Sequence, residues 1–98
     1  MAVKTKELTE EQALLIARAL ADPRRYEILK QLGSQAEPLS CEAVRGCVDI
    51  SPATLSHHMK ELESAGLVEV ERKGKFAHYH LCRDVLEAFF GKLRSDLI

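Results

Sequence analysis

The spacing of apolar residues along the chain predicts helices at both ends and a β-hairpin between the last two of them. Apolar positions recur at helical intervals in five segments: 9–20, 23–33, 40–47, 51–65 and 83–97. After the fourth segment the period changes to two, because Val68 and Val70 alternate with glutamates as in a half-exposed strand. Lys73-Gly74 is a turn signal, so residues 76–82 are expected to return as a second strand.

Start and stop signals bound these helices. Asp22-Pro23 and Ser51-Pro52 each place a capping side chain before a proline at the first helical position. Gly33 and Gly66 are expected to end the second and fourth helices through left-handed turns. The segment 34–39 is expected to be a loop.

The order of these elements predicts the architecture. Two short helices joined by a few residues and followed by a charged hairpin form the layout of a winged helix-turn-helix. The expected fold class is therefore mainly α (α+β), with five helices plus a two-stranded β-hairpin wing. We expect one domain over residues 1–98, with residues 1–7 frayed.

The fourth helix carries the candidate chemistry. At about 100° per residue, Leu55, Met59 and Leu62 fall on one side of the helix. The opposite side is small and polar and lacks a carboxylate before Glu61, which suits the major groove of duplex DNA. With the short helix before it and the wing after it, the candidate DNA contacts are Arg45, Ser51, Ala53, Thr54, Ser56, His57, Lys60, Arg72, Lys73 and Lys75.

Charge supports this interpretation only through its placement. The formal net charge is −1, with 14 Lys and Arg against 15 Asp and Glu, so no global attraction to DNA exists. Arg72, Lys73 and Lys75 nevertheless crowd the hairpin without an acid among them. The alternative is a winged-helix module that binds protein and has no DNA role. An enzyme is not expected, because a Gly-rich phosphate loop, a nucleophile elbow and paired catalytic carboxylates are all missing.

Three segments also resemble the arsenic-repressor (ArsR) family of transcriptional regulators. They are residues 21–29 with Ala-Asp-Pro-Arg-Arg, residues 51–62 with Ser-His-His-x-Lys-x-Leu, and residues 65–68 with Ala-Gly-Leu-Val. The resemblance covers about residues 10 to 95. It implies a homodimeric repressor that binds a near-palindromic duplex operator and is released by an effector.

The resemblance also implies a dimer interface made by the first and last helices, which agrees with the apolar surplus on both. The candidate interface residues are Leu15, Ile16, Leu86, Phe89, Phe90 and Leu93. A chain of 98 residues also gains useful burial by pairing with a second copy.

The effector stays unidentified at this stage. Metal-sensing members of the family often carry Cys-x-Cys before the short helix, or Asp and His on the last helix, and neither pattern is intact here. His78 and His80 share a strand face but need further ligands to hold a metal. We therefore expect no metal site and no cofactor. Thiol sensing through Cys41, Cys47 or Cys82 is an alternative to three plain reduced thiols.

The chain carries no apolar run long enough to span a bilayer and no long apolar stretch after its first lysines. We therefore expect a cytoplasmic protein with no membrane partner.

Overall fold

The computed structural model describes residues 7–98, and the elements follow the predicted order. The helices are α1 (Glu10–Leu20), α2 (Pro23–Gly33), α3 (Cys41–Cys47), α4 (Pro52–Ser64) and α5 (Arg83–Leu97). The strands are β1 (Leu39–Ser40), β2 (Val68–Lys73) and β3 (Phe76–Leu81). The fraying expected for residues 1–7 falls mainly on residues 1–6, which lie outside the described residues.

Local capping explains why the helices start where they do. The Thr9 hydroxyl accepts from the Gln12 N–H at 3.1 Å, and the Gln12 side chain accepts from the Thr9 N–H at 2.9 Å. Gly66 has φ of 79° and ends α4 as predicted. Gly33 is the last residue of α2, as predicted, but the left-handed turn expected there was wrong: Gly33 is helical, and the capping residue Ser34 keeps a right-handed φ of −80°. The Ser34 N–H bonds to the Lys30 and Leu32 carbonyls, so the last turn tightens without a left-handed residue.

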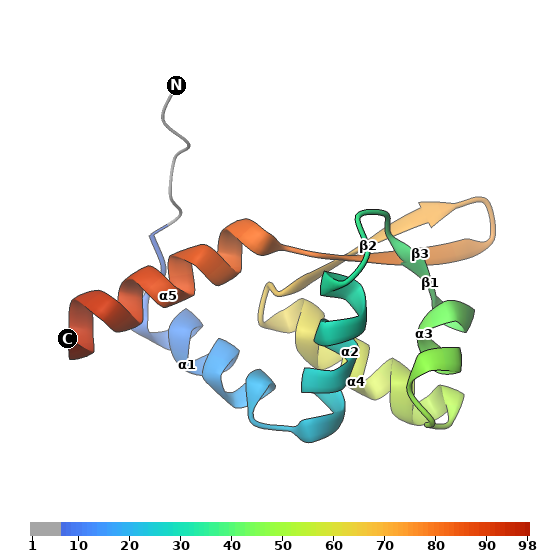
Figure 1. Ribbon diagram of the computed structural model, residues 1–98, viewed down its shortest axis with the longest axis horizontal. Coiled ribbons are helices and arrows are strands. Elements are labelled where there is room, and N and C mark those ends of the chain that lie inside the picture. The colour runs from blue at the N-terminus through green and yellow to red at the C-terminus, as the bar shows by residue number, and fades with distance from the viewer. Residues whose placement is uncertain (1–6) are drawn as a thin grey trace.

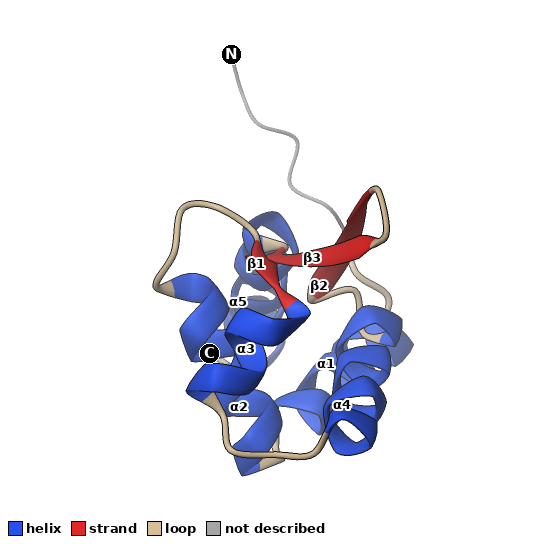
Figure 2. Ribbon diagram, turned by 90° about the vertical axis from the view of Figure 1, so that its right-hand side faces the viewer, coloured by secondary structure: helices blue, strands red, loops and turns tan. Residues whose placement is uncertain are grey.

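The sheet has three antiparallel strands in the order β1-β3-β2, where the sequence predicted a hairpin of two (Figure 2). Leu39 of β1 pairs with Tyr79, and Ser40 pairs with His78. A strand of two residues is too short to display alternation, so the pattern of 34–39 predicted only a loop. The extra strand ties the start of α3 to the wing.

One hydrophobic core joins the helices and the base of the sheet. Its fully buried side chains include Ile16 from α1, Ile28 from α2, Leu55 and Leu62 from α4, and Leu67. Figure 1 shows α1 and α5 at one end of the molecule and the hairpin of β2 and β3 extending toward the other. Among the described residues, the helices lack the length and apolar character needed to cross a membrane.

Two residues predicted for the dimer interface belong to this core. Ile16 is 0% exposed and Phe89 is 5% exposed, so neither offers a surface to a partner. Ile16 lies in the nearly continuous apolar run of residues 13–20, and Phe89 lies in the broad apolar stripe of residues 83–97. In both helices, the spacing did not separate the face toward the core from the face away from it. Leu86 is half-buried against the core, whereas Leu15, Phe90 and Leu93 are exposed.

Candidate nucleic-acid interface

The outer side of α4 is not covered by any other part of residues 7–98. Ala53, Thr54, Ser56, His57 and Lys60 are all exposed, as the helical projection predicted. The opposite side, with Leu55, His58, Met59 and Leu62, is buried. We call the five exposed residues the α4 strip. The helix therefore uses one side for the core and leaves a polar, carboxylate-free side open to a ligand.

Ser51 holds the start of this helix. Its hydroxyl oxygen accepts from the Thr54 N–H at 3.2 Å, and the hydroxyl donates to Thr54 Oγ1 at 2.9 Å. The cap therefore also orients one residue of the α4 strip, because its hydrogen bond holds the Thr54 hydroxyl in place. The unpaired N–H groups of the first turn add partial positive charge at the same end of α4.

Two arginines at the start of α2 fasten this helix to the chain segments on either side of it. Arg24 donates to the Asp49 carbonyl at 3.2 Å, which ties α2 to the connector between α3 and α4. Arg25 donates to the carbonyls of Ala19 and Arg18, at 3.0 and 3.3 Å, and so satisfies the end of α1. Their neighbour Asp22 caps α2: its carboxylate accepts from the backbone N–H groups of Arg25 and Arg24, and these hydrogen bonds lower the pKa of the carboxyl. The turn between α3 and α4 is therefore held against α2 by the hydrogen bond from Arg24 to the Asp49 carbonyl.

The wing approaches the strip from the side. A surface groove of about 470 Å³ is lined by Ser56, His57, Met59, Lys60 and Glu63 from α4 and by Arg72 and Tyr79 from the sheet. Arg72 lies on the face of β2 that also carries Val68 and Val70, whereas Glu69 and Glu71 lie on the other face. The alternation therefore turns Arg72 toward the groove beside the α4 strip and keeps Glu69 and Glu71 out of this groove.

The tip of the hairpin carries the remaining basic residues. Lys73 pairs with Phe76 across a turn of Gly74 and Lys75, and Gly74 has φ of 64°. A positive φ at only the first of two turn residues is typical of a type II′ hairpin, which favours glycine there. Lys73 and Lys75 are exposed at this tip. Arg45 is exposed on α3 and does not line the groove between α4 and the sheet.

His58 is the buried polar residue of α4. Its ring packs against the core, and the ring centroids of His57 and His58 lie 5.7 Å apart. Its Nδ1 is buried without a hydrogen-bond partner among the described residues. Burial lowers the pKa of His58 from its usual 6.5, and the nearby Asp22 carboxylate opposes this shift. The ring is therefore held neutral under the exposed strip.

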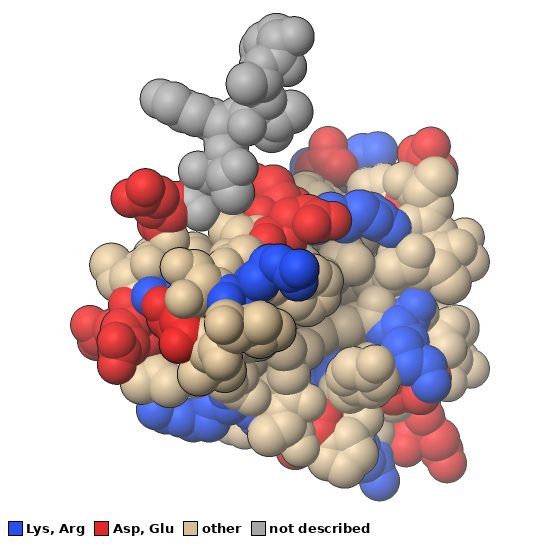
Figure 3. All heavy atoms as spheres, turned by 60° about the vertical axis from the view of Figure 1, so that its left-hand side comes forward, with Lys and Arg blue, Asp and Glu red and all other residues tan. Residues whose placement is uncertain are grey.

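The end of the molecule formed by α1 and α5 differs in character. A groove of about 460 Å³ is lined largely by apolar side chains, including Leu14, Leu93 and Leu97. Leu14, Leu15, Phe90, Leu93 and Leu97 remain exposed there. Figure 3, with this end brought forward, shows charged groups of both signs scattered over a largely uncharged surface.

The three cysteines occupy different environments in the described part of the chain. Cys41 is half-buried at the start of α3, Cys47 is exposed at its end, and Cys82 is buried beside α5. None of them forms a disulfide.

Comparisons with known proteins agree with this geometry. Residues 20–71 match the helix-turn-helix domain family. The chain is 38% identical over 72 residues to the arsenical resistance operon repressor of Staphylococcus xylosus, covering 74% of this chain and 67% of that protein. It is 30% identical over 79 residues to the cadmium resistance transcriptional regulatory protein CadC homolog of Staphylococcus aureus, covering 78% and 64%. The chain thus spans about two thirds of the length of these curated relatives.

A solved structure extends the likeness to the whole fold. The homodimeric winged helix-turn-helix DNA-binding domain from Mycobacterium bovis superposes with a TM-score of 0.72 at 30% identity, covering 88% of this chain and 80% of that one. The relatives named here are transcriptional regulators rather than enzymes. With the helix-turn-helix pair, the wing and these matches in place, the chain belongs to the ArsR-type family of winged helix-turn-helix transcriptional regulators.

Proposed function

We propose that this chain is a homodimeric repressor that inserts α4 into the major groove of a near-palindromic operator. The observation that carries this proposal is the α4 strip, which is exposed, polar and free of carboxylates, and whose groove also contains the basic Arg72. Occupancy of the operator would block access by the polymerase.

The residues divide into two roles. Ser56, His57 and Lys60 lie where side chains reach base edges or nearby phosphates, while Ala53 lets the backbone approach. Arg72, Lys73 and Lys75 would contact phosphates or the adjacent minor groove. Arg45 on α3, with Ser51 and Thr54 at the start of α4, would contact the phosphate backbone of the DNA. Base contacts set sequence preference, and phosphate contacts set overall affinity.

The second copy would pair through α1 and α5. Several apolar side chains there stay exposed among the residues that the structure describes: Leu14, Leu15, Phe90, Leu93 and Leu97. Half-buried Leu86 would lie at the edge of this dimer interface, whereas Ile16 and Phe89 pack in the core beneath it. The winged helix-turn-helix domain from Mycobacterium bovis is homodimeric, which supports a homodimer here. A two-fold dimer presents two α4 helices to half-sites about one helical turn apart.

Salt dependence of DNA binding tests the proposal. Fluorescence anisotropy of a labelled duplex, titrated between low and moderate salt, should show affinity falling steeply, because each neutralised phosphate releases counterions. If the chain is instead a protein-binding module, it should not bind duplex DNA even at low salt concentration. The family resemblance also leads us to expect that a small effector, whether a metal, a thiol-reactive compound or another molecule, releases the DNA. Adding a candidate effector to the same anisotropy titration tests this release.

A further inference from the structure

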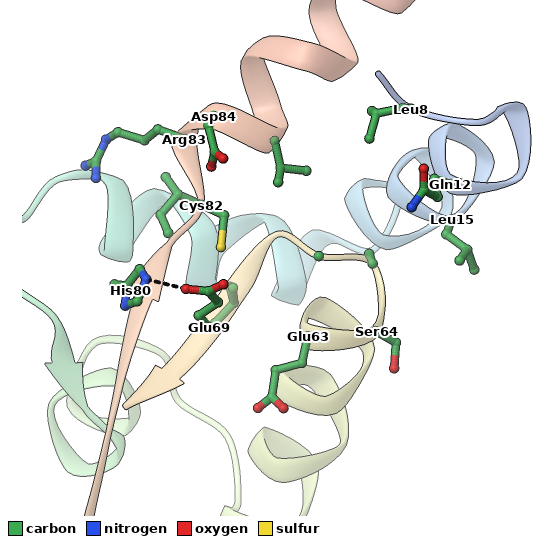
Figure 4. Close-up of a pocket in the computed structure, with 15 residues that line it drawn as sticks. Leu8, Gln12, Leu15, Glu63, Ser64, Glu69, His80, Cys82, Arg83 and Asp84 are labelled. Carbon is green, nitrogen blue, oxygen red and sulfur yellow. Dashed lines mark hydrogen bonds and ion pairs between the residues drawn. The ribbon is translucent and has the colours of Figure 1, made fainter. Parts of the chain in front are cut away.

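Three potential metal ligands converge at the base of the wing, away from the α4 strip. They are the Glu69 carboxylate, the His80 imidazole and the Cys82 thiol, and one ligand atom from each lies within 4.8 Å of the others. His80 Nε2 and Glu69 Oε1 are already 3.0 Å apart. Figure 4 shows the Cys82 sulfur directed toward this pair.

Strand geometry explains why these residues meet. Glu69 and His80 are direct partners in the β2–β3 ladder, so their side chains emerge on the same face. Cys82 is two residues after His80 and returns to that face. The Cys82 N–H donates to the Leu67 carbonyl at 2.8 Å, which continues the antiparallel register beyond the end of β3. The convergence is therefore a product of the fold rather than of flexible side chains alone.

The donor set suits zinc. Zn²⁺ binds thiolate, imidazole and carboxylate at bond lengths of about 2.0–2.3 Å, and tetrahedral ligands then lie roughly 3.4–3.6 Å apart. Separations of 3.0 Å and at most 4.8 Å need adjustments of about 1.4 Å or less, and exposed Glu69 can supply most of them. A mixed nitrogen, sulfur and oxygen set favours Zn²⁺ over Mg²⁺ or Ca²⁺, which prefer oxygen alone.

The surroundings leave room for a fourth ligand. The three side chains line a pocket of about 630 Å³ that opens between α1, the end of α4 and the start of α5. Two further carboxylates, Glu63 and Asp84, also line it and favour a cation. Arg83 lines the pocket, but its guanidinium donates to the carbonyls of Gly33 and Gln35, at 3.0 and 3.4 Å, and points away in Figure 4.

We propose that Glu69, His80 and Cys82 form a zinc site with an open fourth position that faces this pocket. On binding, the metal takes the place of the His80–Glu69 contact and the Cys82 thiol loses its proton to solvent. The proposal departs from the expectation of no metal site. The sequence offered His80 with His78, and only the ladder register supplies Glu69 and Cys82 instead.

Cobalt titration of the reduced, metal-free protein tests the site. Co²⁺ alone should bind at one ion per chain and give a thiolate-to-cobalt charge-transfer band, which Zn²⁺ then displaces. Cys82→Ser should abolish the band. Glu69→Gln should weaken Co²⁺ binding by about 100-fold or more, beyond the 10- to 100-fold that loss of an outer-shell partner costs. Glu69 is exposed, so this variant should keep the fold, and circular dichroism checks it.

Matched controls lie one ladder step away and on α3. Glu71 pairs with His78 on the same face of the hairpin without a third ligand, so Glu71→Gln and His78→Gln should bind Co²⁺ as the wild type does. Cys47→Ser should keep the band. Wild-type affinity in Glu69→Gln, loss of the band in Cys47→Ser, or no stoichiometric binding by the wild type would each overturn the site. The titration contains no DNA, so its outcome is independent of the proposed operator binding.

Discussion

The two ends of this molecule expose surfaces of opposite kinds. At one end, α4 and the wing expose hydroxyls, an imidazole and basic groups around a groove. At the other, α1 and α5 expose leucines and a phenylalanine. A charged, hydrogen-bonding surface suits a polyanion, whereas an apolar one suits another protein surface. A chain of this size can thus divide its exterior between DNA and a second copy of itself.

The largest expected effect comes from placing a charge at the apolar end. Phe90→Glu should raise the dimer dissociation constant by about 100-fold, because a buried carboxylate without a partner costs several kcal/mol. Phe90 is 55% exposed and Phe76, in the wing, is 58% exposed, so Phe76→Glu is a matched control. Analytical ultracentrifugation should show monomers for the first variant and dimers for the second. Equal behaviour of the two would remove the distinction between the ends.

The basic tip of the wing should have a smaller effect, confined to DNA. Lys73→Ala or Lys75→Ala should each weaken binding by about tenfold for every duplex and lower the salt slope by about one. Lys30→Ala is the control, because Lys30 pairs with Glu27 on α2 at 3.3 Å, away from the wing. A tip variant with an unchanged salt slope would show that its lysine does not contact phosphate.

Capping of α2 should contribute to stability at the level of a single hydrogen-bonded side chain. Asp22→Ala should reduce the free energy of unfolding by about 1 kcal/mol, since the carboxylate accepts from the N–H groups of Arg24 and Arg25. Asp22→Asn keeps an acceptor and should recover most of that loss. Urea denaturation at pH 7 measures both, and an alanine variant as stable as the wild type would contradict the role.

The smallest expected effect is a pH dependence from His58. Burial lowers its pKa in the folded state below 6.5, so the unfolded chain binds more protons as the pH falls. The stability from the neutral ring is therefore fully present above about pH 6.5 and is lost as the pH falls toward the folded-state pKa. His58→Gln should flatten urea midpoints between pH 7.5 and 5.5, whereas His57→Gln, on the exposed strip, should not. A slope retained by His58→Gln would assign the dependence elsewhere.

The sequence predicted most of what depends on local pattern. Helical spacing assigned Leu55, Met59 and Leu62 to the core and left the strip outside, and capping signals at Asp22 and Ser51 were confirmed. Contacts between segments that are distant in the sequence could not be predicted from local pattern. The hydrogen bond of Arg24 to the Asp49 carbonyl, the pairing of β1 with β3 and the meeting of Glu69 with Cys82 all require the tertiary register. Ile16 and Phe89 were misplaced because each lies within a wide apolar face, and the spacing alone does not reveal which part of that face packs against its own chain.

The central claim is that the α4 strip reads DNA bases. Selection of tight binders from a pool of random duplexes tests it most directly, with wild type, a Ser56→Ala/His57→Ala variant and the Lys73→Ala variant run side by side. The wild type should select two inverted half-sites about 10 base pairs apart, the double variant should select altered bases within each half-site, and Lys73→Ala should keep the wild-type sequence. An identical sequence selected by the double variant, or no selected sequence from the wild type, would contradict the claim.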